Sequence, residues 1–145
     1  MLHHRNIMVV TNNMNVAQTL SANPECEVIV AGGQLRRSDN GLVGALTVST
    51  IERFRFDLAI IGCSALDESG DILDFDIQEV SVSQAILGRS RKVFLVADHS
   101  KFARGAPARI GSLGDVDVFF TDRSLPPKAA ETCRDNGVEV VIAGQ

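Results

Sequence analysis

Cysteine is scarce in this sequence, and its three thiols are far apart. Cys26, Cys63 and Cys133 are the only cysteines in 145 residues, and no two of them form a C-x-x-C pair. A low, odd and scattered count is typical of reduced thiols in a cytoplasmic protein rather than of a disulfide framework. We therefore expect a cytoplasmic location.

Long apolar runs and an excess of basic charge are also absent. No run approaches the ~18 residues of a membrane span, and no signal peptide begins the chain. The 14 lysines and arginines are outnumbered by 18 aspartates and glutamates, which gives a formal charge of −4. Because strong nucleic-acid binders usually carry a basic surface, we expect no DNA binding by the chain itself and no membrane partner. We assign no role to His3 and His4.

The common signatures of cofactor and catalytic sites are missing as well. The sequence has no G-x-G-x-x-G, Walker loop, G-x-S-x-G or H-E-x-x-H. Their absence removes the commonest dinucleotide, nucleotide, hydrolase and zinc-protease interpretations. The acidic stretch from Asp67 to Asp76 lacks the spacing of a calcium loop, so a solvated loop is the simpler interpretation. We expect no metal ion and no cofactor.

What the sequence does contain is an alternation of apolar runs and amphipathic segments. Apolar runs predict strands at residues 7–10, 26–31, 57–62, 92–97, 116–120 and 138–142. Helical spacing predicts helices over 15–23, 44–54, 76–89 and 126–136, with Asp76 as an N-cap and Gly137 as a stop. Residues 34–41 and 102–108 are predicted to be loops. This order predicts an α/β fold with a mostly parallel, Rossmann-like sheet.

Polar residues follow the predicted strands, where the carboxyl ends of a parallel sheet bind ligands. Among them, Lys101 could bind an anion, and Asp98 could accept a hydrogen bond from a sugar hydroxyl. A solvated lysine and a turn-capping aspartate are the alternative, and both interpretations stay open. His99 could be a general base, but no partnered nucleophile is evident, so a structural or exposed histidine is the simpler interpretation.

Other candidates each have a simpler alternative. Gly32 and Gly33 could donate backbone N–H groups to a phosphate, although a turn that needs positive φ explains them more simply. Arg36 beside them could reach an anion or a partner subunit, or be ordinary surface charge. Asp67 and Glu79 could hold hydroxyls or transfer protons, as an isomerase would require.

The order of several short motifs resembles the effector-sensing domain of DeoR-family transcriptional regulators. In chain order these motifs are Val10-Thr11-Asn12-Asn13, Ala31-Gly32-Gly33-Gln34-Leu35-Arg36, Gly41-Leu42-Val43-Gly44, Phe56-Asp57-Leu58-Ala59-Ile60-Ile61-Gly62, Phe75-Asp76-Ile77-Gln78-Glu79-Val80, Ala97-Asp98-His99-Ser100-Lys101-Phe102, and Val116-Asp117 with Thr121-Asp122. The resemblance runs from about Arg5 to the end. Within the family, the stretch from Leu73 to Val80 is similar to regulators that respond to glycerol 3-phosphate.

The resemblance implies a fold, a ligand and partners. The fold would be a three-layer sandwich similar to ribose-5-phosphate isomerase, glucosamine-6-phosphate deaminase and CoA transferases. The ligand would be a phosphorylated sugar or glycerol 3-phosphate, acting as the inducer of a homo-oligomeric repressor. Operator DNA would be bound by a winged helix-turn-helix that precedes the sensing domain. We expect this chain to lack that DNA-binding domain, and also the first sensing strand with its Gly-Thr-Thr phosphate loop.

The residues expected at the effector pocket are Thr11, Asn12, Gly32, Gly33, Arg36, Gly62, Asp67, Glu79, Asp98 and Lys101. By resemblance, Lys101 binds the phosphate, and Asp98 or Glu79 binds hydroxyls. Gly62 with Asp67 matches the loop that carries catalytic carboxylates in the related isomerases. Without the phosphate loop, Lys101 and Arg36 become more important.

Three classes of function remain at this point. The first is a non-catalytic sensor of a small phosphoester. The second is a sugar-phosphate isomerase or deaminase of the same fold, and the third is an oligomerisation module that binds no ligand. The resemblance favours the sensor.

Overall fold

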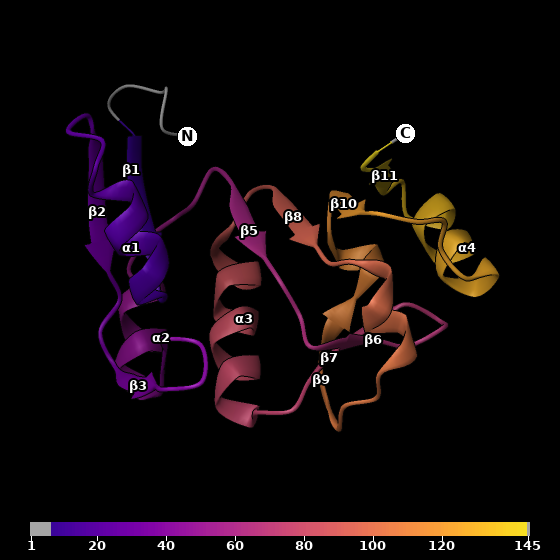
Figure 1. Ribbon diagram of the computed structural model, residues 1–145, viewed down its shortest axis with the longest axis horizontal. Helices are drawn as coiled ribbons and strands as arrows, with labels where there is room; N and C mark the ends of the chain where they lie inside the picture. Colours follow the sequence, from indigo (N-terminus) through magenta and orange to yellow (C-terminus); the bar gives the residue numbers. More distant parts are fainter. Residues whose placement is uncertain (1–6, 145) are drawn as a thin grey trace. The chain divides into compact units, whose positions relative to one another are not determined.

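The chain folds as two units in a computed structural model that describes residues 7–144 (Figure 1). The boundary follows Phe54, so the N-terminal unit ends there and the C-terminal unit begins at Arg55. His3 and His4 lie outside the described residues.

The N-terminal unit pairs two parallel strands through a helical crossover. Its β1 (Ile7–Thr11) and β2 (Cys26–Val30) run side by side, with Ile7 opposite Cys26, and α1 (Met14–Leu20) connects them. The side chain of Asn13 caps α1 by accepting hydrogen bonds from the backbone N–H groups of Asn15 and Val16. An N-cap of this kind satisfies donors that have no partner within the helix.

A short hairpin and a second helix complete the N-terminal unit. The antiparallel strands β3 (Gln34–Arg36) and β4 (Gly41–Val43) precede α2 (Ala45–Ile51). The prediction of a loop over 34–41 was therefore wrong for residues 34–36 and 41, which lie in these two strands. Its polar residues form the hairpin turn, in which the Asp39 carboxylate accepts from the Gly41 N–H and Asn40 adopts a φ of 60°.

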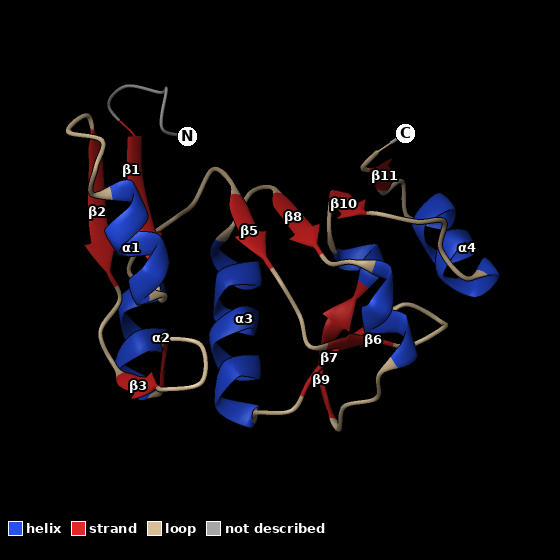
Figure 2. Cartoon of the chain, viewed as in Figure 1, coloured by secondary structure: helices blue, strands red, loops and turns tan. Residues whose placement is uncertain are grey.

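A fully parallel sheet forms the centre of the C-terminal unit (Figure 2). Its strand order is β11-β10-β8-β5, and the strands span Glu139–Ile142, Val118–Thr121, Val93–Val96 and Ala59–Ile61, respectively. All four match predicted strands, because a continuous apolar run is typical of a buried parallel strand. The prediction of an α/β fold with a mostly parallel sheet is confirmed.

A second, antiparallel sheet of the C-terminal unit was not predicted. It contains β6 (Ala65–Leu66), β7 (Asp71–Asp74) and β9 (Ala108–Ser112), in that order. The 3₁₀ helices η1 (His99–Ala103) and η2 (Leu113–Asp115) flank β9 in sequence. The stretch from Asp67 to Asp76 was predicted to be a solvated acidic loop, but part of it forms β7 and is held in this small sheet.

Two helices pack on the C-terminal unit, and both match the prediction. Helix α3 spans Ile77–Arg89 with Asp76 as its N-cap, and α4 spans Pro127–Asp135. Gly137 follows α4 with a φ of 69°, the left-handed conformation in which helices often end. No helix among residues 7–144 is long and apolar enough to cross a membrane.

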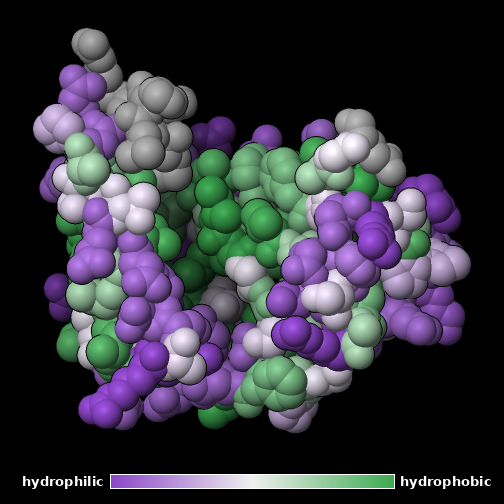
Figure 3. Space-filling view, in the orientation of Figure 1, coloured by the Kyte–Doolittle hydropathy of each residue, from purple (hydrophilic) through white to green (hydrophobic). Residues whose placement is uncertain are grey.

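The core of the C-terminal unit lies on one face of the parallel sheet. Sheet residues Ile61, Leu95 and Phe119 are buried there in one hydrophobic cluster with Val80 of α3 and Cys133 of α4. Side chains alternate between the two faces of a strand. The opposite face is apolar as well, and Figure 3 shows it as a green area over β5 and β8.

Candidate functional site

The carboxyl ends of β5, β8 and β10 bring three polar segments to one edge of the parallel sheet. Gly62 follows β5, Asp98 follows β8 and Asp122 follows β10, and these three strands are neighbours. In open parallel sheets, ligands bind in the crevice beyond the carboxyl ends of the strands. The C-terminal unit therefore has a candidate ligand edge built entirely from its own residues.

The turn after β8 is organised by Asp98, which is the N-cap of η1. Its carboxylate accepts from the Ser100 N–H at 2.9 Å and also from the Ser100 hydroxyl. These two bonds, the hydroxyl first, lower the pKa of Asp98 below its ordinary value. Asp98 is therefore ionised at neutral pH, and Lys101, three residues on in η1, provides a nearby positive charge.

A second carboxylate, Asp122, fastens η1 to the end of β10. The His99 N–H donates to Asp122 Oδ1 at 2.7 Å, and His99 Nδ1 lies 2.9 Å from Asp122 Oδ2. The imidazole bond and then the backbone bond lower the pKa of Asp122. His99 is thus an exposed, structurally engaged histidine, as the simpler interpretation of the sequence expected.

An aromatic contact also holds η1 against the core of the unit. The ring of Phe102, which follows Lys101, meets the buried ring of Phe119 edge to face, with centroids 6.4 Å apart. Aromatic pairs in this geometry are favourable beyond the area they bury. The segment that carries Lys101 is therefore held by the Asp98 cap, the Asp122 bonds and the Phe102 ring.

Cys63 lies within the electrostatic reach of this segment. The pKa of the Cys63 thiol is raised to about 12, chiefly by burial; the Lys101 ammonium opposes this increase, and the carboxylates of Asp74 and Asp98 add to it. A thiol with so high a pKa is neutral and unreactive at physiological pH. Lys101, Asp74 and Asp98 are therefore all close enough to Cys63 to affect the pKa of its thiol.

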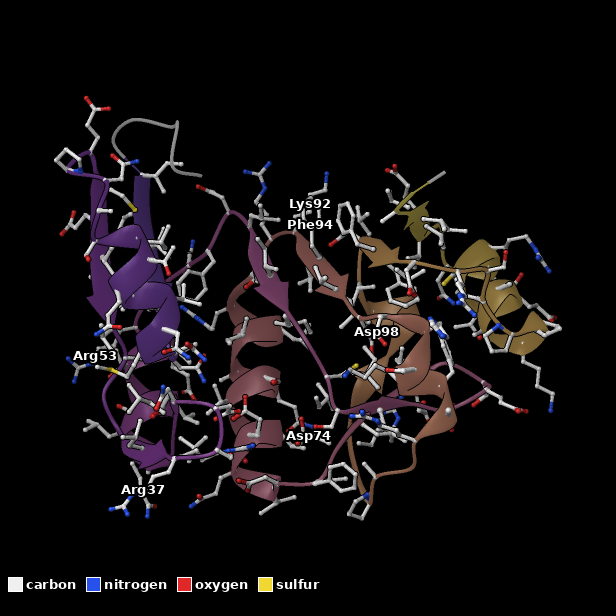
Figure 4. The ribbon with its side chains drawn as sticks, viewed as in Figure 1. Arg37, Arg53, Asp74, Lys92, Phe94 and Asp98 are labelled. Carbon is white, nitrogen blue, oxygen red and sulfur yellow. The ribbon has the colours of Figure 1, made fainter. Side chains whose placement is uncertain are left out.

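Sequence analysis placed Asp74 only in a general acidic stretch, but the structure buries it. The side chain is 5% exposed at the end of β7. Figure 4 shows Asp74 between α3 and the small sheet, and Asp98 beyond the end of β8. No sequence pattern distinguishes Asp74 from its exposed acidic neighbours, because burial here depends on the pairing of β7 with β6 and β9.

Asp67 and Glu79 are the two other acidic candidates of the C-terminal unit. Asp67 Oδ1 accepts from the Ser69 and Asp71 N–H groups, at 3.0 and 2.9 Å, and these bonds lower its pKa, the one from Asp71 most. Asp67 follows β6, and β6 packs against η1, which carries Lys101. Glu79 lies in the first turn of α3. Their role as effector ligands stays a prediction.

The remaining candidates belong to the N-terminal unit. Thr11 ends β1, Asn12 follows it, and the Thr11 carbonyl accepts from the Ala31 N–H at 2.8 Å, so Gly32 also lies at this carboxyl edge. The side chain of Asn12 donates to the Leu42 carbonyl.

Gly33 and Arg36 of this unit have structural partners. Gly33 has a φ of 139°, and an added Cβ would lie 2.0 Å from Thr47 Oγ1, so a glycine is required there. Arg36 forms an ion pair with Asp39 at 3.4 Å. Figure 4 labels two further arginines of the unit, Arg37 and Arg53.

The predicted residues thus form two groups, one in each unit. Thr11, Asn12, Gly32 and Gly33 gather at the end of the β1–β2 pair, with Arg36 in the adjoining hairpin. In the C-terminal unit, Gly62 follows β5, Asp67 follows β6, and Asp98 and Lys101 follow β8, with Glu79 on α3. Sequence reasoning did not find the His99–Asp122 bonds or the burial of Asp74. Among residues 7–144, no three His, Cys, Asp or Glu side chains are placed to hold a metal ion.

Known proteins show the same pattern along nearly the whole chain. Residues 1–123 match the family model of the DeoR C terminal sensor domain. The glycerol-3-phosphate regulon repressor of Escherichia coli (strain K12) is 41% identical over 142 residues, which are 98% of this chain and 56% of that protein.

Two further relatives agree. The glycerol-3-phosphate regulon repressor of Haemophilus influenzae is 47% identical over 121 residues, which are 83% of this chain and 47% of that protein. The HTH-type transcriptional repressor CsqR of Escherichia coli (strain K12) is 34% identical over 98% of this chain and 54% of its own length. The chain spans about half the length of these curated relatives. Its motifs, its parallel sheet and these matches agree, and the chain belongs to the DeoR C-terminal sensor domain family.

Proposed function

We propose that this chain is the effector-sensing part of a transcriptional repressor, and that its effector is a small phosphoester, glycerol 3-phosphate first of all. Two relatives are named glycerol-3-phosphate regulon repressors, and they share 41% and 47% identity with the chain. In a protein of the relatives' length, operator DNA would be bound by a segment outside these residues, within a cytoplasmic homo-oligomer. Effector binding would lower operator affinity, and by reciprocal coupling operator binding would lower effector affinity.

The observation that carries the proposal is the firmly held turn with Lys101 beyond the end of β8. An ammonium group is a compact charge suited to a phosphate, and Asp98 beside it is an acceptor suited to a hydroxyl. The Asp98 cap and the bonds from His99 to Asp122 fix this turn before any ligand binds. Such preorganisation reduces the entropy that binding costs.

A sensor fits the geometry better than an isomerase does. The hydrogen bonds that Asp67 Oδ1 accepts from its own turn lower the pKa of this carboxyl. A general base is most effective when its pKa lies near the operating pH, so this change makes Asp67 a weaker base. We expect no turnover of ribose 5-phosphate or glucosamine 6-phosphate. Turnover that disappears in both Asp67→Asn and Glu79→Gln would overturn the sensor assignment.

A calorimetric titration of the chain with glycerol 3-phosphate tests the proposal, with glycerol and inorganic phosphate as comparison ligands. We expect saturable binding that Lys101→Ala weakens about 10- to 100-fold, the range for one charge-assisted contact. Lys92→Ala is the matched control, because Lys92 lies at the other end of β8, where its ammonium covers the Phe94 ring at 5.7 Å. Its removal should leave the affinity unchanged.

The outcomes separate the possible explanations. Equal losses in Lys101→Ala and Lys92→Ala would indicate general charge attraction and would refute a site at Lys101. Absence of binding to the unmodified chain, and also to a longer protein that contains it, would overturn glycerol 3-phosphate as the effector. Binding only to the longer protein would show that residues outside this chain complete the pocket.

A further inference from the structure

Asp74 is a buried carboxylate that the proposed site does not yet use. Its side chain is 5% exposed, and its Oδ1 atom accepts from the N–H groups of Phe75 at 2.8 Å and Asp76 at 3.3 Å. Oδ2 receives no hydrogen bond from the described residues, yet it is not sealed from solvent. Oδ2 is therefore an acceptor that solvent can reach in the free protein and that a hydroxyl of a bound ligand could use in place of water.

The strand register places Asp74 beside the segment that leaves β5. The Ser64 N–H donates to the Leu73 carbonyl at 3.2 Å, and Ala65 lies opposite Leu73 in the antiparallel β6–β7 pair. Asp74 therefore lies opposite Ser64, one residue beyond Cys63. The adjoining strand β6 packs against η1, which carries Lys101.

The electrostatics agree with this placement. The Cys63 thiol is influenced both by the Lys101 ammonium and by the carboxylates of Asp74 and Asp98. One positive and two negative groups therefore lie near Cys63, which follows β5, and Figure 4 shows Asp74 on the side of α3 and Asp98 beyond β8. A phosphate would be attracted by Lys101 and repelled by Asp74. A ligand with a phosphate at one end and a hydroxyl at the other matches this polarity.

We propose that Asp74 determines effector specificity by accepting a hydrogen bond from a hydroxyl on the carbon chain of a phosphoester whose phosphate lies at Lys101. This inference rests on the proposed function, and it adds that the effector must carry a hydroxyl group on its carbon chain. A site built to bind a hydroxyl discriminates strongly against an analogue that lacks it, because the buried acceptor is then left unpaired. Asp74 thus selects polyol phosphates over simple alkyl phosphates.

The test compares two ligands that share a phosphate and a three-carbon chain, glycerol 3-phosphate and propyl phosphate. We expect the unmodified chain to prefer glycerol 3-phosphate by about 10- to 100-fold. In Asp74→Asn, Oδ1 still accepts from the Phe75 and Asp76 N–H groups, but an amide that donates replaces Oδ2. The preference should fall to a few-fold, while propyl phosphate binds as before or more tightly.

Asp71→Asn is the matched control, because Asp71 lies on the same strand but is more exposed and bonds to Arg109 at 3.0 Å. It should keep the full preference. Thermal unfolding monitors whether Asp74→Asn is folded, and Asp74→Ser is a second variant that retains an oxygen acceptor for the turn. The same loss of preference is expected there.

The possible results distinguish a failure of the role of Asp74 from a failure of the proposed function. An unchanged preference in folded Asp74→Asn or Asp74→Ser would overturn the role of Asp74 while leaving the proposed function intact. A wild-type chain that binds both ligands equally would also overturn it. Binding of neither ligand by the wild-type chain, nor by a longer protein that contains it, would overturn the proposed function first, and the role of Asp74 with it.

Discussion

Two phenylalanines on neighbouring strands should differ sharply in their contribution to stability, because they lie on opposite faces of the parallel sheet. Phe119 of β10 is fully buried in the core cluster and contacts Phe102. Phe94 of β8 is half-buried on the other face, where its ring meets Phe120 with centroids 5.2 Å apart. The register pairs Phe119 with Leu95, one residue after Phe94.

The expected magnitudes follow from this burial. Truncating a fully buried phenylalanine to alanine typically costs about 3–5 kcal/mol, because both transfer energy and a cavity are involved. Phe94→Ala loses partial burial and one ring pair, so we expect about 1–2 kcal/mol. Since domains of this size are stable by about 5–15 kcal/mol, Phe119→Ala should remove about a fifth of the total or more.

Urea unfolding followed by circular dichroism measures both free energies of unfolding in the intact chain. The midpoints should shift in the ratio of these costs, with little change in the slope of the transition. Phe119→Leu, which keeps most of the volume, should recover much of the loss. Equal losses in Phe119→Ala and Phe94→Ala would refute the assignment of the core to one face of the sheet.

Three further predictions concern a glycine, a carboxylate and a thiol. Gly33→Ala should destabilise the chain by about 1–3 kcal/mol in urea, because its Cβ would lie 2.0 Å from Thr47 Oγ1; an equally costly Gly32→Ala, which meets only a flexible side chain, would contradict this reason. The lowered pKa of Asp122 means that its bonds stabilise the fold above the ordinary carboxyl range and are lost as the pH falls through the lowered value. Asp122→Asn should therefore flatten part of the decline in Tm between about pH 7 and pH 3, and an unchanged profile would argue against it. Because the pKa of Cys63 is raised to about 12, iodoacetamide should not label this thiol at pH ~8.5 until the chain unfolds, and rapid native labelling would oppose its burial.

Local sequence patterns were enough to predict most of the fold. The continuous apolar runs at 57–62 and 92–97 contain β5 and β8, since a strand covered on both faces needs apolar side chains throughout. Asp76 caps α3 and Gly137 follows α4, because capping depends on residues within one turn of the helix end. The turn with Asp98 and Lys101 was also predictable, because it comes immediately after the continuous apolar run at 92–97.

Short strands could not be predicted in the same way. β6 has two residues and β7 has four, with polar side chains among them, so neither shows a periodicity. β7 gains its strand conformation from β9, where Leu73 lies opposite Arg109, far along the chain. Only tertiary pairing stabilises such segments, because an isolated strand pair is marginal in water.

The sequence by itself therefore determined the four α-helices, the strands of the parallel sheets and the polar residues that follow them, since each of these depends on neighbours along the chain. Only the tertiary structure decided which of the acidic side chains is buried and that His99 has a carboxylate partner. His99 and Asp122 are 23 residues apart, and Asp74 is distinguished from Asp71 only by the strands around it. Burial and distant hydrogen bonds arise when separate segments pack together, and no local pattern records them.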